Sequence, residues 1–315
     1  MKVVVTGGAG FIGSHIVGEL VRRNQEVIVI DNFHTGHKQN LSKFANKIKI
    51  LEGRVFDAIK KNPDLKPDFI IHCGMPSSSP MYKENRNMVH KTIEDAITLF
   101  EFAKENGSKI VLTSSSSVYN GLPIAWKEEM KPIVSDFYTE TRLAIERLAE
   151  LYYKLHNVNT ICLRLFSVYG PREEFKRNFA NMISQTIWKV LKDERPVFYG
   201  DGNQTRDFIF VDDVVNAFIR SIDILNKKDV GFEIVNVGSG TNKSFNEILE
   251  LINEKLNKDV KAIYVKNPIK NYVYHTLADT TKMERFLKFK PKIELERGIM
   301  ETINYYKKLD RLPEI

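Results

Sequence analysis

Short apolar runs rich in β-branched residues alternate with longer segments of helical period through the first half of the chain. Such alternation is typical of βαβ units built around a parallel sheet. The segment 13–24 carries an apolar stripe from Ile16 to Val21, which predicts a helix whose apolar face packs on that sheet. The strands predicted by this pattern span residues 2–6, 27–30, 47–51, 69–72, 109–114 and 160–165.

The alternation loosens after Leu165. Helices are predicted over 178–192, 244–256 and 295–309, among short strands and turn-rich pieces such as Gly200-Asp201-Gly202-Asn203. We therefore expect an α/β protein with a Rossmann-type doubly wound parallel sheet in residues 1–165 and a smaller C-terminal α/β substrate domain in 166–315. Residues 207–211 and the helix from 212 read as one more strand and helix, so 207–225 is a candidate to return to the first sheet.

Composition excludes several classes of protein. The 315 residues are 43% hydrophobic with 17 Gly and 11 Pro, which excludes a disordered or low-complexity chain. The net charge of +7 is spread over lysines interspersed with acids, so we expect no nucleic-acid partner. Apolar runs are strand-sized, and we expect no membrane span. Because no signal-peptide pattern precedes the first strand, the expected location is cytoplasmic.

Cysteine and histidine positions indicate no metal chemistry. Cys73 and Cys162 lie inside apolar runs, which predicts core thiols in a reducing compartment. His34 and His37 share a predicted loop, but no cysteine or acid stands near them at the spacing of a zinc site. The sequence therefore predicts no bound metal.

A glycine-rich turn joins the first predicted strand to the first helix, with glycines at 7, 10 and 13. Glycines at this spacing allow a tight turn and a close backbone approach to a pyrophosphate, which the free N–H groups of the helix N-terminus can bind. Asp31 ends the second strand, where a carboxylate accepts hydrogen bonds from ribose hydroxyls and disfavours a 2′-phosphate. An ordinary βα turn is the weaker alternative, and NAD is the predicted cofactor. The predicted cofactor-binding residues are Gly7, Gly10, Phe11, Ile12, Gly13, Asp31 and Asn32.

A second group of polar residues indicates acid/base chemistry. Ser114 to Ser117 follow a predicted strand, and the carboxyl ends of parallel strands are where open α/β sheets build their sites. Tyr138 and Arg142 stand four residues apart on a predicted helix and therefore share a face. A phenol accepts a proton near neutral pH only where positive charge stabilises the phenolate, and Arg142 with an oxidised nicotinamide would supply that charge.

These motifs resemble the extended short-chain dehydrogenase/reductase superfamily, in particular the NAD-dependent epimerase/dehydratase family and its nucleotide-sugar 4-epimerases of the UDP-glucose 4-epimerase type. The resemblance covers nearly the whole chain. Besides the glycine turn, it is carried by Asp31-Asn32, Thr35-Gly36, Ser114–Tyr119, the Tyr138 helix, Arg164–Arg172, Gly200–Phe208 and Ala278-Asp279.

The resemblance implies a mechanism. Tyr138 would take the proton of the sugar 4-hydroxyl while hydride passes from C4 to NAD, and Ser115 would hydrogen-bond that hydroxyl. The 4-keto sugar would then turn over and receive hydride on its other face. Arg142 would contact the nicotinamide ribose and complete the catalytic set with Tyr138 and Ser115.

The resemblance also implies a partner and binding residues. The expected substrate is a nucleotide-diphosphate sugar, with Arg206 on the diphosphate, Asn178 beside it and Asp279 near the nucleotide. Tyr274 stands where the family usually has a phosphate-binding arginine, so it is included among the substrate-binding residues. A homodimer is expected through the helices 92–106 and 138–156, whose excess apolar residues are Leu99, Phe100, Phe102, Leu148, Leu151 and Tyr152.

Several positions depart from the family pattern. Arg142 replaces the usual lysine, Arg54 an acid, Met88 an asparagine and Ser167 another asparagine. Two alternatives to an epimerase follow: another nucleotide-sugar enzyme that forms a 4-keto group, as an oxidoreductase or dehydratase, and a weakly active NAD-binding regulatory protein. Serines occupy 116 and 117, where the dehydratases carry an Asp-Glu pair and the decarboxylases a Glu, and this favours epimerisation.

Overall fold

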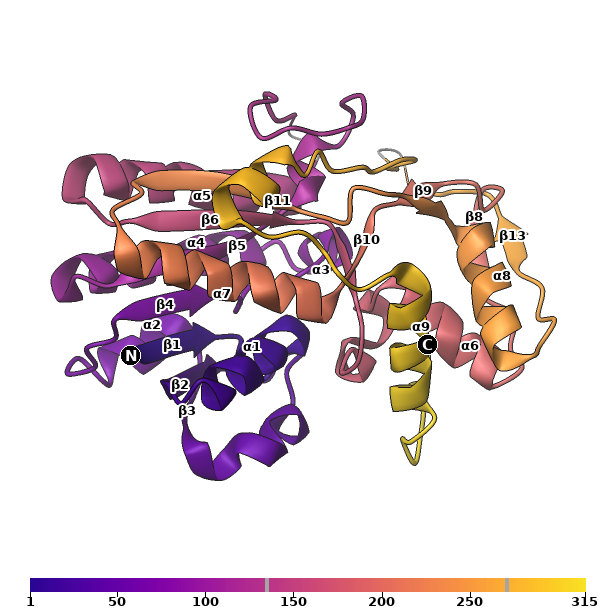
Figure 1. Cartoon of the computed structure of the whole chain (residues 1–315), viewed down its shortest axis with the longest axis horizontal. Coiled ribbons are helices and arrows are strands. Elements are labelled where there is room, and N and C mark those ends of the chain that lie inside the picture. Colours follow the sequence, from indigo (N-terminus) through magenta and orange to yellow (C-terminus); the bar gives the residue numbers. More distant parts are fainter. Residues whose placement is uncertain (134–135, 270–271) are drawn as a thin grey trace.

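A seven-stranded parallel sheet forms the centre of the protein, in the order β11-β6-β5-β4-β1-β2-β3 (Figure 1). The computed structural model describes residues 1–133, 136–269 and 272–315. The sheet consists of β1 (Lys2–Thr6), β2 (Glu26–Asp31), β3 (Ile48–Glu52), β4 (Phe69–His72), β5 (Lys109–Ser115), β6 (Thr160–Leu165) and β11 (Phe232–Val237). The order reverses between β1 and β4, so the predicted doubly wound fold is confirmed.

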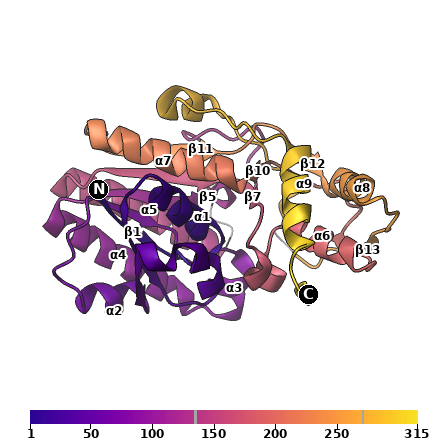
Figure 2. The same ribbon diagram turned by 60° about the horizontal axis from the view of Figure 1, so that its bottom comes forward.

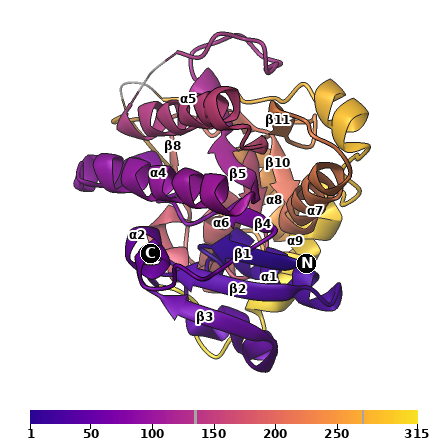
Figure 3. The ribbon, with the colours of Figure 1, turned by 90° about the vertical axis from the view of Figure 1, so that its left-hand side faces the viewer.

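Helices cover both faces of the sheet (Figure 3). Strand side chains alternate between faces, so Val3 and Val5 belong to one apolar core and Val4 to the other. One face carries α1 (Phe11–Arg22) and α7 (Val211–Lys227), preceded in the chain by strand β10 (Phe208–Phe210). The other carries α2 (Val55–Lys60), α4 (Met88–Asn106) and α5 (Phe137–His156). Burial on both faces explains why the strands are almost continuously apolar.

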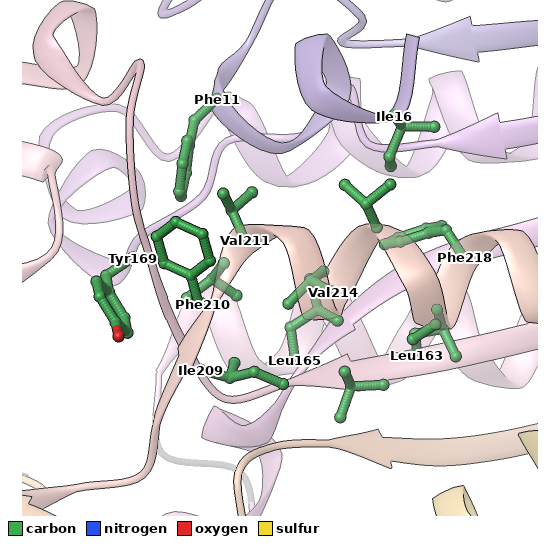
Figure 4. Packing of buried hydrophobic residues seen from close by; sticks show 14 of the residues in the cluster. Phe11, Ile16, Leu163, Leu165, Tyr169, Ile209, Phe210, Val211, Val214 and Phe218 are labelled. Carbon is green, nitrogen blue, oxygen red and sulfur yellow. The ribbon is translucent and has the colours of Figure 1, made fainter. Parts of the chain in front are cut away.

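The first core lies where α1 and α7 meet over the sheet (Figure 4). Ile16 on α1, Phe218 on α7 and Leu163 on β6 are each at most 3% exposed. The stripe predicted from Ile16 to Val21 is therefore the face of α1 that packs inward.

The strand β11 was not predicted. Its first three residues are only half-buried because it forms the edge of the sheet, and Glu233 and Asn236 interrupt the apolar pattern. The strand and the helix of the segment 207–225 lie in different parts of the fold. Strand β10 pairs with β7 (Ser167–Tyr169) outside the large sheet, whereas α7 packs on the sheet and leads into β11. Part of the range assigned to a second domain thus completes the first sheet.

The smaller part of the molecule lies at the end of the sheet, where α6, α8 and α9 gather (Figure 2). Its helices are α6 (Met182–Leu191), α8 (Phe245–Leu256) and α9 (Leu295–Tyr306), and its short strands pair β8 (Val197–Tyr199) with β13 (Ile263–Val265) and β9 (Thr205–Arg206) with β12 (Lys243–Ser244). Short helical turns are α3 (Ser79–Glu84), η1 (Lys38–Lys47), η2 (Ser116–Tyr119), η3 (Glu174–Phe179) and η4 (Met283–Leu287). Helix α8 begins at a capping box formed by Ser244 and Glu247.

The apolar residues that suggested a dimer face fall into a buried group and a more exposed group. Leu99, Phe100 and Phe102 are at most 4% exposed and pack within one subunit, so their burial needs no partner. Leu148 and Tyr152 are partly buried against this core, and Leu151 is 48% exposed. No helix in the described part of the chain combines the length and apolarity of a membrane span.

A buried ion pair joins α5 to the sheet. Arg164 on β6 donates from Nε and Nη2 to the two carboxylate oxygens of Glu146 on α5, at 2.9 and 2.6 Å. Ser114 on β5 donates to the same carboxylate at 2.5 Å, and Arg164 also donates to Tyr119 Oη at 2.6 Å. Burial alone would lower the pKa of Arg164, but the hydrogen bonds and charge of Glu146 raise it above its usual value. The pair is therefore charged and fully hydrogen-bonded.

We expect Glu146→Gln and Arg164→Met each to lower the free energy of unfolding by about 3–5 kcal/mol, because each leaves an opposite charge buried without its partner. The measurement is urea unfolding followed by circular dichroism. The double variant Glu146→Leu/Arg164→Met should lose far less than the sum of the two effects, since it leaves no isolated charge. Arg297→Met, which breaks an exposed pair with Glu301, is the control. Single effects no larger than this control would contradict the prediction.

Candidate active site

A cleft of about 660 Å³ runs along the carboxyl edge of the sheet. Residues at or just beyond the ends of β1, β2, β4, β5 and β6 line one side, and residues of η3, β9 and the segment 273–276 come from the smaller part of the molecule. Parallel strands end at one edge, so turns far apart in sequence meet there. Of the residues predicted from the sequence, the cleft gathers Gly7, Gly10, Phe11, Ile12, Gly13, Asp31, Asn32, Ser115, Tyr138, Arg142 and Arg206.

The glycine turn is too crowded for side chains. Gly7 has φ +65°, and a Cβ there would lie 2.6 Å from the Cα of Gly74. A Cβ on Gly13 would lie 2.1 Å from the carbonyl oxygen of Gly7, so the helix and the turn are in direct backbone contact. The first N–H groups of α1, at Phe11 and Ile12, have no intrahelical partners and border the cleft. The turn thus forms an anion site with no side chain in the way.

Asp31 stands at the end of β2 beside this turn. It is 6% exposed and accepts hydrogen bonds from the backbone N–H groups of Ala9 and Phe33, both at 2.8 Å. Burial raises the pKa of Asp31, and the two N–H groups oppose that shift. The carboxylate is held in place and faces the cleft, where it can accept hydroxyl donors.

Arg54 also lines the cleft, and the Nη2 group of its guanidinium is engaged by protein acceptors. Nη2 donates to Glu94 at 2.8 Å, to Asp95 at 3.1 Å and to the carbonyl oxygen of Lys91 at 3.0 Å. Burial acts to lower the pKa of Arg54, whereas the two carboxylates raise it overall. The arginine therefore ties β3 and α2 to α4.

Tyr138 and Arg142 occupy consecutive turns of α5, which begins at a cap where Asp136 accepts from the Thr139 N–H at 2.8 Å. They are 9% and 4% exposed, and the guanidinium carbon lies 4.9 Å from the centre of the Tyr138 ring. Arg142 donates from Nη1 to Met75 Sδ at 2.7 Å and from Nη2 to the carbonyl oxygen of Pro76 at 2.8 Å. The spacing therefore produces the predicted pair, and the cation lies over the phenol ring.

The four serines 114–117, at the end of β5 and the start of η2, all line the cleft. The hydroxyl of Ser114 donates to Glu146 in the buried network, whereas that of Ser115 accepts from the Ser117 N–H at 3.2 Å. Within the described lining the only acids are Asp31 and Asp95, and both are held by backbone N–H groups. The cleft near Ser115 therefore offers hydroxyl groups and no carboxylate.

Arg206 enters the cleft from β9. Its guanidinium lies between the rings of Phe245 and Tyr272, 5.4 and 5.5 Å from their centres, and Nη1 donates to the carbonyl oxygen of Tyr274 at 3.2 Å. Burial lowers the pKa of Arg206, yet an arginine stays protonated. A preorganised cation with donors directed at the cleft is suited to an anionic ligand.

Three predicted substrate residues do not line the cleft. Asn178 is exposed at the end of η3, and the nearby Asn181, which caps α6, lines the cleft instead. Tyr274 is 60% exposed, whereas Val273 and Thr276 of the same segment line the cleft. Asp279 accepts from the Thr281 N–H at 2.9 Å. Sequence spacing alone could not find these directions.

Other residues that the sequence singled out also line the cleft. Met88 and Ser167, two of the departures from the family pattern, both border it, as expected for ligand positions. Cys73 borders it too and is half-buried at the edge of the first core, whereas Cys162 is fully buried. Burial raises the pKa of Cys73 to about 12, so its thiol stays protonated. Lys176 also lines the cleft, although it was not among the residues predicted from the sequence. Its place after the Tyr169-Gly170-Pro171 motif could have suggested it.

The residues present fit a dinucleotide. The glycine turn forms a cradle that any Cβ at Gly7 or Gly13 would fill, and Asp31 stands beside it at the neighbouring strand end. Among the described residues, no three His, Cys, Asp or Glu side chains gather in a way that could hold a metal ion. The chain's own groups thus supply an anion cradle, a ribose acceptor and a phenol beside a cation.

Comparisons with known proteins agree with this geometry. UDP-glucuronic acid decarboxylase 4 of Arabidopsis thaliana is 32% identical over 95% of this chain and 67% of its own length. The UDP-N-acetylglucosamine 4-epimerase of Methanobrevibacter ruminantium, solved with UDP-N-acetylmuramic acid, is 30% identical with a TM-score of 0.90, covering 97% of this chain and 98% of that one. The UDP-glucuronic acid 4-epimerase of Bacillus cereus, solved with UDP-glucuronic acid and NAD, is 26% identical with a TM-score of 0.87, covering 98% and 99%.

The model of the NAD dependent epimerase/dehydratase family matches residues 3–238. This range contains the glycine turn, Asp31, Ser115, the Tyr138 helix and Arg206. The chain therefore belongs to the NAD-dependent epimerase/dehydratase family.

Proposed function

We propose that this protein is an NAD-dependent nucleotide-sugar 4-epimerase of the UDP-glucose 4-epimerase type. The observation that carries the proposal is the meeting of Tyr138, Ser115 and Arg142 in one cleft with the dinucleotide cradle. Relatives named as 4-epimerases of several UDP-sugars support a substrate of this class.

In the proposed reaction Tyr138 accepts the proton of the sugar 4-hydroxyl and later returns it. Ser115 hydrogen-bonds the same hydroxyl and holds it toward the phenol, while Arg142 stabilises the phenolate by its charge over the ring. Bound NAD supplies the acceptor, and then the donor, of the hydride at C4.

The absence of an acid beside Ser115 in the described lining favours epimerisation. Elimination needs an extra acid and base near the sugar. The two acids of the lining, Asp31 and Asp95, do not stand beside Ser115, and backbone N–H groups hold their carboxylates. Glu146 is nearby in the fold, but Arg164 and Ser114 occupy its carboxylate. Proton transfer at a single hydroxyl requires only the phenol and the serine.

The residues at the two ends of the cleft are proposed to bind different ligands. We propose that the glycine turn holds the NAD diphosphate and that Asp31 accepts from the adenosine ribose, with Asn32 beside it. At the other end, Arg206 is proposed to bind the diphosphate of the nucleotide sugar as a planar donor.

We propose in addition a homodimer through the outer faces of α4 and α5, which pack side by side on one face of the sheet (Figure 3). Ile97 on α4 and Leu151 and Leu155 on α5 are 38, 48 and 64% exposed. Apolar side chains gathered on two neighbouring helices suit a twofold four-helix contact.

The first expected outcome concerns the reaction. Incubation with UDP-glucose, UDP-galactose, their N-acetyl forms or the uronic acids should give inversion at C4 for at least one pair, measured by proton NMR. Tyr138→Phe should lower kcat by about 10²–10⁴-fold, since it removes the proton acceptor. Tyr264→Phe, on the exposed β13 strand away from the cleft, is the matched control and should retain activity.

Other products would identify the alternatives. A stable keto sugar or net accumulation of NADH would indicate another enzyme that forms a 4-keto group, and release of carbon dioxide from a uronic acid would indicate a decarboxylase. Bound NAD with no turnover of any of these sugars would favour a regulatory role.

The second expected outcome concerns Arg142. Arg142→Lys keeps a positive charge but cannot contact Met75 and Pro76 together, so we expect kcat to fall at least about tenfold while the protein still folds. Steady-state kinetics on the inverting pair measures it. Higher turnover in the lysine variant would instead mean that the natural activity has been relaxed.

The third expected outcome concerns assembly. Leu151→Glu/Leu155→Glu should convert a dimer into a monomer, because it places charges in the proposed contact, and light scattering after gel filtration measures the mass. Val197→Glu, at an exposed apolar position on β8, is the matched control. A wild-type monomer would exclude the proposal.

A further inference from the structure

Residues 171–176, which we call the strap, cross from the smaller part of the molecule to the glycine turn. The carbonyl oxygen of Pro171 contacts His15 Nε2 at 3.1 Å, and Arg172 donates from Nη1 to the carbonyl oxygen of Ser14 at 3.1 Å. Phe175 stacks on His37, with ring centres 4.0 Å apart and planes 8° apart. The strap is thus anchored both on α1 and on the loop that follows β2.

Lys176, the last residue of the strap, lies beside the first turn of α1. Lys176 lines the cleft, its side chain is 16% exposed, and its ammonium lies 5.5 Å from the centre of the Phe11 ring. Phe11 is the first residue of α1, where the backbone N–H groups are free to bind an anion. The ammonium therefore stands beside the anion cradle without belonging to it.

Glu173 holds this ammonium in place. It is fully buried, and its carboxylate accepts from Lys176 Nζ at 3.1 Å, the Asn181 N–H at 3.1 Å and Ser184 Oγ at 2.6 Å. The Lys176 ammonium has three donors, and among the described residues it has one hydrogen-bond acceptor, this carboxylate. Two donors are left for a ligand in the cleft.

The positions of the cationic side chains in the cleft favour Lys176 as the counter-ion of a diphosphate. The glycine turn contributes no side-chain cation, and a diphosphate carries about two negative charges. Within the described lining, the other cationic side chains are those of Arg54, Lys91, Arg142 and Arg206. Arg54 donates to Glu94 and Asp95, Lys91 is exposed on α4, and Arg142 donates to Met75 and Pro76 beside Tyr138. Arg206, on β9, lies near the rings of Phe245 and Tyr272. Lys176 is the lining cation in contact with the first turn of α1.

We infer that Lys176 binds the diphosphate of NAD beside the glycine turn, so that the strap helps to hold the bound cofactor. The inference rests on NAD as the cofactor and holds for any sugar substrate. A reaction that returns its hydride to the substrate requires the cofactor to remain bound through the cycle, and a strap anchored at His15, Ser14 and His37 would retain it.

The test is calorimetric titration of the nucleotide-stripped protein with NAD, ADP-ribose, adenosine and UDP. Lys176→Met should weaken NAD and ADP-ribose alike by about tenfold or more, because both carry the diphosphate, and should leave adenosine and UDP unchanged. Lys176→Arg should keep most of the affinity. Lys243→Met, which breaks an exposed ion pair with Glu247 on α8, is the matched control.

Three results would overturn the inference. Unchanged binding of NAD and ADP-ribose would mean that Lys176 only supports Glu173. Weaker UDP with unchanged NAD would mean that the lysine serves the substrate diphosphate. An equal loss for adenosine, which has no phosphate, would mean that the variant damages the fold of the strap, and thermal unfolding of each variant checks this directly.

Discussion

The position of helix α5, which carries Tyr138 and Arg142, depends on the buried ion pair between Arg164 and Glu146. Arg164 projects from the sheet, and Glu146 lies one turn beyond Arg142 on α5. Because Ser114 donates to the same carboxylate, one interaction fixes two neighbouring strands and the helix. Alternation along β5 then directs Ser115 to the cleft, opposite the turn of α5 that carries Tyr138. A charge pair that is fully hydrogen-bonded can specify such an arrangement where apolar contacts alone would permit sliding.

Two residues that depart from the family pattern form hydrogen bonds with their surroundings. Arg54 donates to a carboxylate on α4, and Arg142 donates to the sulfur of Met75 and the carbonyl oxygen of Pro76. Burial and the Arg142 charge lower the pKa of the neighbouring His72 to about 3, so this buried ring is neutral near pH 7. His72 therefore adds no second positive charge beside Arg142 near pH 7.

Most of the sheet was predictable because its strands are buried on both faces, and a continuous apolar run is a strong local signal. Strand β11 was missed for the converse reason. It lies at an edge, half of it is partly exposed, and its polar residues meet partners from distant segments, as when Asn236 donates to the carbonyl oxygen of Trp126. The pairing of β10 with β7 likewise depends on contacts between residues far apart in the chain.

The sequence by itself determined the features whose physics is local. The glycine turn follows from backbone crowding at Gly7 and Gly13, and the Tyr138–Arg142 pair follows from the helical repeat. Tertiary structure alone decided which side chains of the second half face the cleft. Tyr274 lies exposed where its segment meets β9, in a contact between Thr205 and His275, which are far apart in the chain. Lys176 has its acceptor, Glu173, three residues away, but it reaches the cleft because the strap packs on Ser14 and His15 of α1, more than 150 residues earlier. No local spacing encodes these long-range contacts.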